Sequence, residues 1–280
     1  MPLLKLNRGN IFYQTTGDIG HNTNSPIVIL KPLSRGPIGI QPFIDILASS
    51  FFVINYDQRG LGKSEPSVIS GPIPMSERAN EVVELLDGLS IKSTHLLCHS
   101  TGCGIGLSMI NRFPDRIESL SLVSPWTHAD SHLNTMQNLR VSAAKDLNSI
   151  DYFRFNISLL YPPSYRKQYK LGFKKMELEA KKNTVNHKFI SDGLTPILEF
   201  NSKDILPTIK CPTLVSYSRD DQLMPFWFGQ NITNNIEGAV EYVFNEGGHM
   251  LLETCTEKLG LQITNFINKN KRKEKGVKNE

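Results

Sequence analysis

Apolar-rich runs of strand length alternate with amphipathic stretches of helix length along most of the chain. The runs at 27–30, 51–56, 94–98 and 120–124 are typical of strands, and the stretches at 37–48, 76–89 and 101–113 are typical of helices. Strands and helices that alternate in this way build a parallel sheet with helices on both faces. The pattern therefore predicts an α/β fold.

The two ends of the chain add to this prediction. Residues 2–16 have the pattern of a β-hairpin that turns at 7–10. Residues 211–217 and 240–244 are expected to form two further strands, and a last helix is expected over 255–267.

The alternation stops between about 127 and 205, where no strand pattern is found and aromatic and basic residues are frequent. We expect this segment to fold as several helices inserted over the sheet. The chain then divides into a core of residues 1–126 and 206–268, a helical cap of residues 127–205, and a tail of residues 269–280.

The net charge of +4 lies entirely in that tail, which holds six Lys or Arg and two Glu. The remaining residues carry 25 basic and 25 acidic groups, so the body is neutral and no nucleic-acid partner is expected. A short basic run at the end of a chain is typical of a disordered, solvated tail.

Apolar patterning and cysteine spacing predict the cellular setting. No apolar stretch is long enough to span a bilayer, and Lys5 and Arg8 interrupt the apolar start, unlike a signal peptide. The four cysteines have no metal-like spacing and fit a reducing compartment. We expect a cytoplasmic protein with no membrane partner, no metal and no cofactor.

Candidate chemistry begins at Ser100, between the strand at 94–98 and the helix at 101–113. A serine on a sharp strand-to-helix turn forms a nucleophile elbow, which lifts its hydroxyl clear of the sheet. The N–H of Thr101, at the positive end of the helix, is a candidate donor to the charge that develops on a substrate oxygen. A serine hydroxyl also needs a base to take its proton.

The chain supplies an acid and a histidine after Ser100. Asp221 follows the strand at 211–217, and His249 lies in a Gly-Gly-His loop after the strand at 240–244. Because the carboxyl ends of parallel strands share one edge of a sheet, we expect the three side chains to meet. His249 is then the general base, and Asp221 holds its tautomer. Asp220 is the alternative acid, one position away.

With these motifs the chain resembles the α/β-hydrolase fold superfamily over residues 2–268. Asp57-Gln-Arg-Gly-Leu-Gly-Lys-Ser64 is similar to the family's Asp-x-Arg-Gly-x-Gly-x-Ser turn, and Gly-Gly-His249-Met-Leu-Leu-Glu253 is similar to its catalytic histidine loop. Residues 99–102, 112–116, 122–126 and 160–163 most resemble enol-lactonases and aminoacrylate hydrolases. The resemblance implies an α/β-hydrolase fold: a mostly parallel sheet, helices on both faces, and an inserted helical cap over the pocket.

Two positions depart from the family pattern. Cys98 stands where Gly-x-Ser-x-Gly has its first glycine, and a cysteine is small enough for that position. Lys31-Pro32-Leu33 stands where the family has His-Gly, and the resemblance implies that the Leu33 N–H is the second oxyanion donor. Lys31 is either a partly exposed loop lysine or a cation near the oxyanion, suited to a carboxylated substrate.

The residues proposed to line the substrate pocket come from this loop, from the end of the strand at 120–124 and from the expected cap. They are Lys31, Trp126, His128, Phe153 and Tyr161.

Together these features predict a serine hydrolase that cleaves a small ester, lactone or amide-like substrate with Ser100, His249 and Asp221. The expected partner is a small-molecule substrate. The altered loop at Lys31 favours an alternative, a C–C bond hydrolase or a lyase or cyclase of a biosynthetic pathway. A thioesterase acting on an acyl carrier and a slow-turnover ligand receptor are two further alternatives.

Overall fold

A computed structural model of the protein describes residues 3–6, 8–18, 25–33, 36–65 and 71–277, with the side chains of 271–277 left out. Over these residues, eight strands form one sheet in the order β1-β2-β4-β3-β5-β6-β7-β8. They are β1 (Leu3–Leu4), β2 (Ile11–Thr16), β3 (Ile27–Leu30), β4 (Val53–Tyr56), β5 (Thr94–His99), β6 (Ile117–Val123), β7 (Thr213–Ser218) and β8 (Val240–Phe244). The strands β1, β2 and β4 pair antiparallel and all other pairs are parallel, which confirms the expected mostly parallel sheet.

Alternate residues of the strands pack on opposite faces of the sheet. In β3, Val28 and Leu30 join a core cluster with α2 (Met75–Gly88), α3 (Thr101–Arg112) and α9 (Phe226–Asn235). Ile27 and Ile29 join a second cluster with α1 (Gln41–Ala48) and α11 (Thr256–Val277). All four side chains are fully buried, as expected for a strand covered on both faces.

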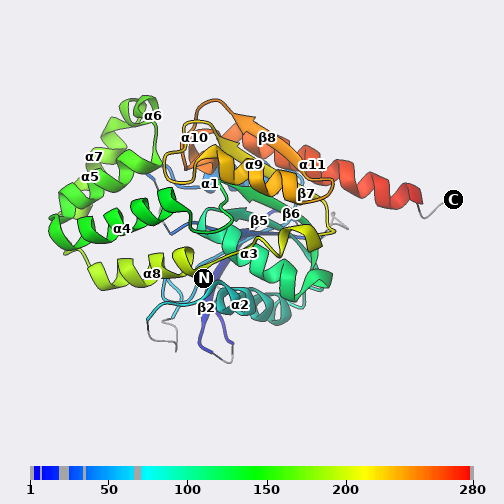
Figure 1. The fold of residues 1–280 in the computed structure, drawn as a ribbon. Helices are drawn as coiled ribbons and strands as arrows, with labels where there is room; N and C mark the ends of the chain where they lie inside the picture. The colour runs from blue at the N-terminus through cyan, green and yellow to red at the C-terminus, as the bar shows by residue number, and fades with distance from the viewer. Residues whose placement is uncertain (1–2, 7, 19–24, 34–35, 66–70, 278–280) are drawn as a thin grey trace.

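Five α-helices lie between β6 and β7: α4 (Ser131–Asp146), α5 (Ser149–Leu160), α6 (Pro163–Gln168), α7 (Lys170–Ala180) and α8 (His187–Glu199). They gather on one side of the sheet, at the left of Figure 1. We call them the cap helices. An isolated bridge between His128 and Asn201 joins the two segments that lead into and out of them.

Several element boundaries differ from the sequence-based prediction. The helix expected from residue 37 begins at Gln41, since Gly39 has a φ of +67° that a helix does not accommodate. The strand expected over 120–124 begins at Ile117, which pairs with Thr94. The last helix runs to Val277 instead of 267, so the disorder expected for 269–280 is replaced by helical backbone as far as Val277. Residues 278–280 lie outside the described residues.

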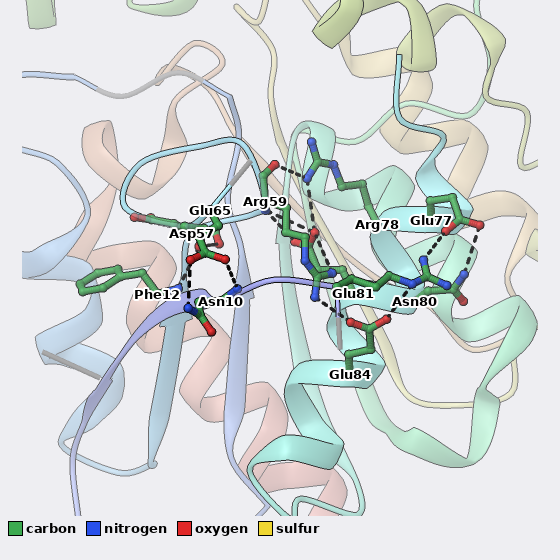
Figure 2. A network of polar contacts seen from close by, with 12 residues as sticks. Asn10, Phe12, Asp57, Arg59, Glu65, Glu77, Arg78, Asn80, Glu81 and Glu84 are labelled. Carbon is green, nitrogen blue, oxygen red and sulfur yellow. Dashed lines mark hydrogen bonds and ion pairs between the residues drawn. The ribbon is translucent and has the colours of Figure 1, made fainter. Parts of the chain in front are cut away.

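A polar network fixes the turn that follows β4 (Figure 2). Arg59 donates from Nη2 to Glu84 Oε2 at 2.7 Å, and its backbone N–H donates to Glu81 Oε1 at 3.2 Å. Arg78 Nη1 donates to the Arg59 carbonyl at 2.7 Å. Burial raises the pKa of Glu81, although Arg78 and Arg59 oppose that shift. The turn is therefore held to α2 by nearly buried charges.

The same turn is also held to the antiparallel side of the sheet. Asn10 donates from its backbone N–H to Glu65 Oε2 at 2.8 Å, and the Phe12 N–H donates to Ser64 Oγ at 2.9 Å. Ser64 Oγ in turn donates to the Asp57 carbonyl. The turn matters for the site because residues 58–61 form part of a cavity wall described below.

No helix among the described residues is long and apolar enough to cross a membrane.

Replacing the buried arginine of this network should cost far more stability than replacing an exposed one. We expect Arg59→Met to lower the free energy of unfolding by about 3 kcal/mol, because a buried carboxylate then loses an ionic partner. The control is Arg8→Met. Arg8 pairs with Glu77 at 3.0 Å but its side chain is 46% exposed, so the loss should stay below about 1 kcal/mol. If urea denaturation showed that both variants lose the same free energy of unfolding, this account of the turn would be contradicted.

Candidate active site

The turn between β5 and α3 holds Ser100 in a strained backbone conformation. Its φ of 53° and ψ of −119° lie outside the regions that non-glycine residues favour. The Ser100 N–H donates to the Val123 carbonyl at 2.9 Å, which ties the turn to β6. Gly102 allows the turn to pack closely, because a Cβ there would lie 2.1 Å from the Leu30 carbonyl oxygen. Ser100 therefore stands on the elbow that the sequence predicted.

The three candidate catalytic side chains form one hydrogen-bonded chain. His249 Nε2 lies 2.7 Å from Ser100 Oγ, and His249 Nδ1 lies 2.8 Å from Asp221 Oδ2. The three residues are 5% exposed or less. They lie in the turns and loops that follow β5, β7 and β8, whose carboxyl ends share one edge of the sheet. The structure thus brings together the residues singled out in the sequence.

The two neighbouring aspartates do different things. Asp221 Oδ1 accepts the N–H groups of Leu223 and Met224, both at 2.9 Å, which fixes the carboxylate against His249. Asp220 Oδ1 accepts the Gly248 N–H at 2.8 Å instead. Asp221 is thus the partner of the imidazole, and Asp220 holds the loop that carries it.

The backbone of His249 is anchored from three sides. Its N–H donates to the Leu160 carbonyl, at the end of α5, at 3.0 Å. Its carbonyl accepts from His99 Nε2 at 2.8 Å and from Ser124 Oγ at 2.9 Å. Burial, followed by the charge of His249, lowers the pKa of His99 to about 3, so this ring is neutral near pH 7. The cap helices and the sheet therefore both position the imidazole.

Two cavities meet beside Ser100. A small one of about 20 Å³ is lined by Ser100, His249 and Thr101, with Pro32 and Leu33 from the loop after β3. A larger one of about 730 Å³ extends under the cap helices and reaches residues 58–61 of the β4 turn. Thr101, Leu33, Leu160 and Arg140 line both cavities, which makes them adjoining spaces.

The predicted oxyanion donors both border the small cavity, next to Ser100. Thr101 is the first residue of α3, and its N–H is one of the groups that a helix leaves without an internal partner. The side chain of Leu33 is 39% exposed. The role of these two N–H groups stays a prediction.

The structure corrects four of the five residues expected in the substrate pocket. Phe153 lines the large cavity, whereas the other four line neither cavity. Lys31 Nζ pairs with Asp57 Oδ1 at 2.7 Å, so its charge is already neutralised there. Trp126 is fully buried, and its Nε1 donates to the Ile197 carbonyl. The remaining two also have other partners.

Those two are His128 and Tyr161. The ring of His128 packs edge-on against Phe228, and its Nδ1 lies 2.8 Å from Thr127 Oγ1. The hydroxyl of Tyr161 donates to Glu253 Oε1 at 3.1 Å. The same carboxylate oxygen accepts the Gly36 N–H, and both bonds are buried. Burial raises the pKa of Glu253 and of Tyr161.

Asp57 shows why Lys31 is not free to face a substrate. Burial alone would raise the pKa of Asp57, but hydrogen bonds from Lys31 and from the Lys63 N–H outweigh it and lower that pKa. Lys31 thus acts as the partly exposed loop lysine, not as a cation at the oxyanion.

Cys98, the first departure from the family pattern, is accommodated by a glycine. Its Sγ lies 2.4 Å from where a Cβ on Gly106 would stand, so the two residues share space that two side chains could not.

Two residues beside Ser100 were missed by the sequence analysis. Arg140 and Gln137, both on α4, line the small cavity with it. Burial lowers the pKa of Arg140. No sequence pattern indicated their location, since an arginine and a glutamine in a predicted helix are usually exposed at the surface.

No group of three or more His, Cys, Asp or Glu side chains among the described residues is arranged to hold a metal ion.

Comparison with known proteins agrees with this geometry. The profile of the α/β-hydrolase fold family matches residues 36–254. RutD of Caulobacter sp. (strain K31), whose name proposes that it is a carbamate hydrolase, is 26% identical over 226 residues, 81% of this chain and 84% of that protein.

Solved structures show the same fold. The enol-lactonase from Burkholderia xenovorans LB400 superposes with a TM-score of 0.82 at 22% identity, covering 95% of this chain and all of that one. A thermophilic esterase from Thermogutta terrifontis gives 0.81 at 18% identity, covering 96% and 99%. The protein therefore belongs to the α/β-hydrolase fold family, and it is an enzyme of the hydrolase class.

The buried His99 should make stability fall in acid. Its folded pKa of about 3 lies below the usual 6.5, so its contribution is complete above pH 6.5 and is lost as the pH falls toward 3. In that window the group lowers the free energy of unfolding by up to about 1.4 kcal/mol per pH unit. His99→Gln, which can still donate to the His249 carbonyl, should flatten the curve of unfolding free energy against pH.

The matched control for this pH series is His187→Gln, at an exposed position where α8 begins. Its curve should run parallel to that of the wild type. A His99→Gln curve as steep as the wild type would refute the assigned role of His99.

Proposed function

We propose that the protein is a serine hydrolase that cleaves an ester, lactone or amide-like acyl bond. The observation that carries the proposal is the hydrogen-bonded chain from Ser100 Oγ through His249 to Asp221, with distances of 2.7 and 2.8 Å. A serine hydroxyl becomes a useful nucleophile when an oriented imidazole accepts its proton. Asp221, itself fixed by two backbone N–H groups, selects the tautomer with hydrogen on Nδ1.

The proposed cycle has two steps. Ser100 Oγ attacks the substrate carbonyl while His249 Nε2 takes the hydroxyl proton and passes it to the leaving group. Water then attacks the acyl-enzyme, and His249 Nε2 takes one of its protons and returns it to Ser100. The N–H groups of Thr101 and Leu33, which border the small cavity, are the proposed donors to the oxyanion.

Two observations bear on the scissile bond. The relative RutD is named for a carbamate, an acyl group bonded to nitrogen, which supports including amide-like substrates. The Lys31-Asp57 ion pair occupies the charge of the lysine in the altered loop, which supports acyl transfer to water as the proposed reaction; the carbon–carbon alternative, which the Lys31-Pro32 loop favoured, stays untested.

Removal of the nucleophile is the direct test. Ser100→Ala should reduce the hydrolysis of a panel of short and long acyl esters, lactones and thioesters by about 10⁴-fold or more, and should abolish labelling by a fluorophosphonate probe. Ser142→Ala, an exposed serine on α4, is the control and should keep both. Circular dichroism would verify that both variants fold. Undiminished turnover by the Ser100→Ala variant would end the proposal.

The two aspartates provide a second test. Asp221→Asn should lower kcat by roughly 10⁴-fold, because an amide favours the wrong imidazole tautomer. Asp220→Asn should lower kcat by less than about tenfold, because asparagine keeps an acceptor oxygen for the glycine N–H groups. If the two losses were reversed, Asp220 would be the catalytic acid.

A further inference from the structure

The wall of the small cavity holds a buried cation, Arg140, for which the described residues supply no counter-charge. Arg140 is 8% exposed. Its Nε donates to Asn156 Oδ1 at 3.1 Å and its Nη1 donates to Gln137 Oε1 at 2.9 Å. Both acceptors are neutral amides, and within the described part of the chain no carboxylate pairs with this guanidinium. A buried charge without a counter-charge is costly, so the arrangement calls for an anion.

Gln137 adds an unsatisfied donor next to Arg140. It is fully buried, and its Nε2 has no hydrogen-bond partner. Its amide orientation follows from Arg140, because the oxygen must face the guanidinium and the NH₂ group must face the other way. The two residues lie three positions apart on α4 and therefore share a helix face. That face borders the cavity that contains Ser100.

The other charged side chains on the cavity walls already have partners. Arg59 pairs with Glu84 at 2.7 Å, Arg78 lies 3.5 Å from Glu81, and Asp192 pairs with Lys188 at 2.6 Å. Arg140 differs from them in this respect. A guanidinium with free N–H groups matches a carboxylate geometrically and electrostatically better than it matches a neutral oxygen.

The adjoining large cavity indicates what else the substrate carries. At about 730 Å³ it is within the range that holds a drug-sized ligand. The part under the cap helices is mainly apolar, with Phe153, Ile157, Met176, Ile190 and Leu194 on its walls. A small acyl compound would leave most of this apolar surface without contact.

We propose that Arg140 and Gln137 form an anion subsite beside Ser100, and that the substrate is an acyl compound with a carboxylate near its scissile carbonyl and a bulky apolar group in the large cavity. This inference rests on the proposed hydrolase function. The small cavity, about 20 Å³, places the carboxylate a few bonds from the carbonyl. Hydrolysis of such an ester breaks its acyl C–O bond, consumes one water and releases a dicarboxylate, a proton and an apolar alcohol.

The test measures binding separately from turnover, in the Ser100→Ala variant by titration calorimetry. The probes are monobenzyl succinate, its neutral isostere benzyl succinamate, and monomethyl succinate, which lacks the bulky group. We expect monobenzyl succinate to bind roughly 10- to 100-fold more tightly than benzyl succinamate, as for a hydrogen-bonded charge. We also expect it to bind at least about tenfold more tightly than monomethyl succinate, because the benzyl group buries apolar surface.

Two double variants locate the effect. Adding Arg140→Met should reduce the preference for the acid over the amide to within about threefold. Adding Arg154→Met is the charge control, since Arg154 is an exposed arginine of α5 paired with Glu177, and it should leave the preference unchanged. If the Arg140→Met variant fails to fold, the comparison of acid and amide in Ser100→Ala alone decides.

The outcomes separate the two proposals. Equal binding of acid and amide, or no binding of either, overturns the anion subsite. A preference that survives Arg140→Met overturns the assignment to that residue. Selective binding of the acid to Ser100→Ala with no release of benzyl alcohol by the wild type would leave the subsite standing and refute the hydrolase function.

Discussion

The carboxyl edge of the parallel sheet is the constraint on which the site depends. Four neighbouring strands, in the order β5-β6-β7-β8, bring residues up to 149 positions apart in the chain to one place. The sheet can do this because its inner strands are buried on both faces and cannot slip in register without exposing apolar side chains. The strained turn at Ser100 then lifts the hydroxyl toward His249.

Hydrogen bonds connect the cap helices to the loops at the carboxyl edge of the sheet. Leu160 ends α5, accepts the His249 N–H with its carbonyl, and lines both cavities. Glu253 makes a related link, since it accepts from the Gly36 N–H of the loop after β3 and from Tyr161 of the cap. A movement of the cap helices would therefore reach the imidazole and the loop that carries Leu33.

Charge is distributed in two different ways around the cavities. Charged groups near the β4 turn and on α8 are paired within the protein, whereas Arg140 faces neutral amides. The complete pairs stabilise the fold, whereas the charge of Arg140, which has only neutral acceptors, is the one that we propose binds an anionic ligand. The contrast between Lys31 and Arg140 illustrates this. The lysine that the sequence suggested as a substrate cation is neutralised by Asp57, and an arginine from a different element occupies the position beside Ser100.

The sequence by itself determined the fold class, the strand-ending positions of Ser100, Asp221 and His249, and their order along the chain. These depend on local patterns and on the rule that parallel strands share an edge, both of which are visible in one dimension. The choice between Asp221 and the neighbouring Asp220 was made by the structure, in which Asp221 contacts His249 and Asp220 accepts from Gly248. The sequence did not determine where the last helix ends, because its basic final segment has no apolar pattern that would mark the end of a helix.

Only the tertiary structure decided what the cavities contain. Whether a cation faces a substrate depends on which carboxylates lie within a few ångströms of it, and those come from distant parts of the chain, as Asp57 does for Lys31. The same holds for Tyr161 and Trp126, which look like pocket walls in sequence but pack into buried contacts with Glu253 and Ile197. Packing between cap and core has no short-range signature, and so the pocket could be read only from the folded chain.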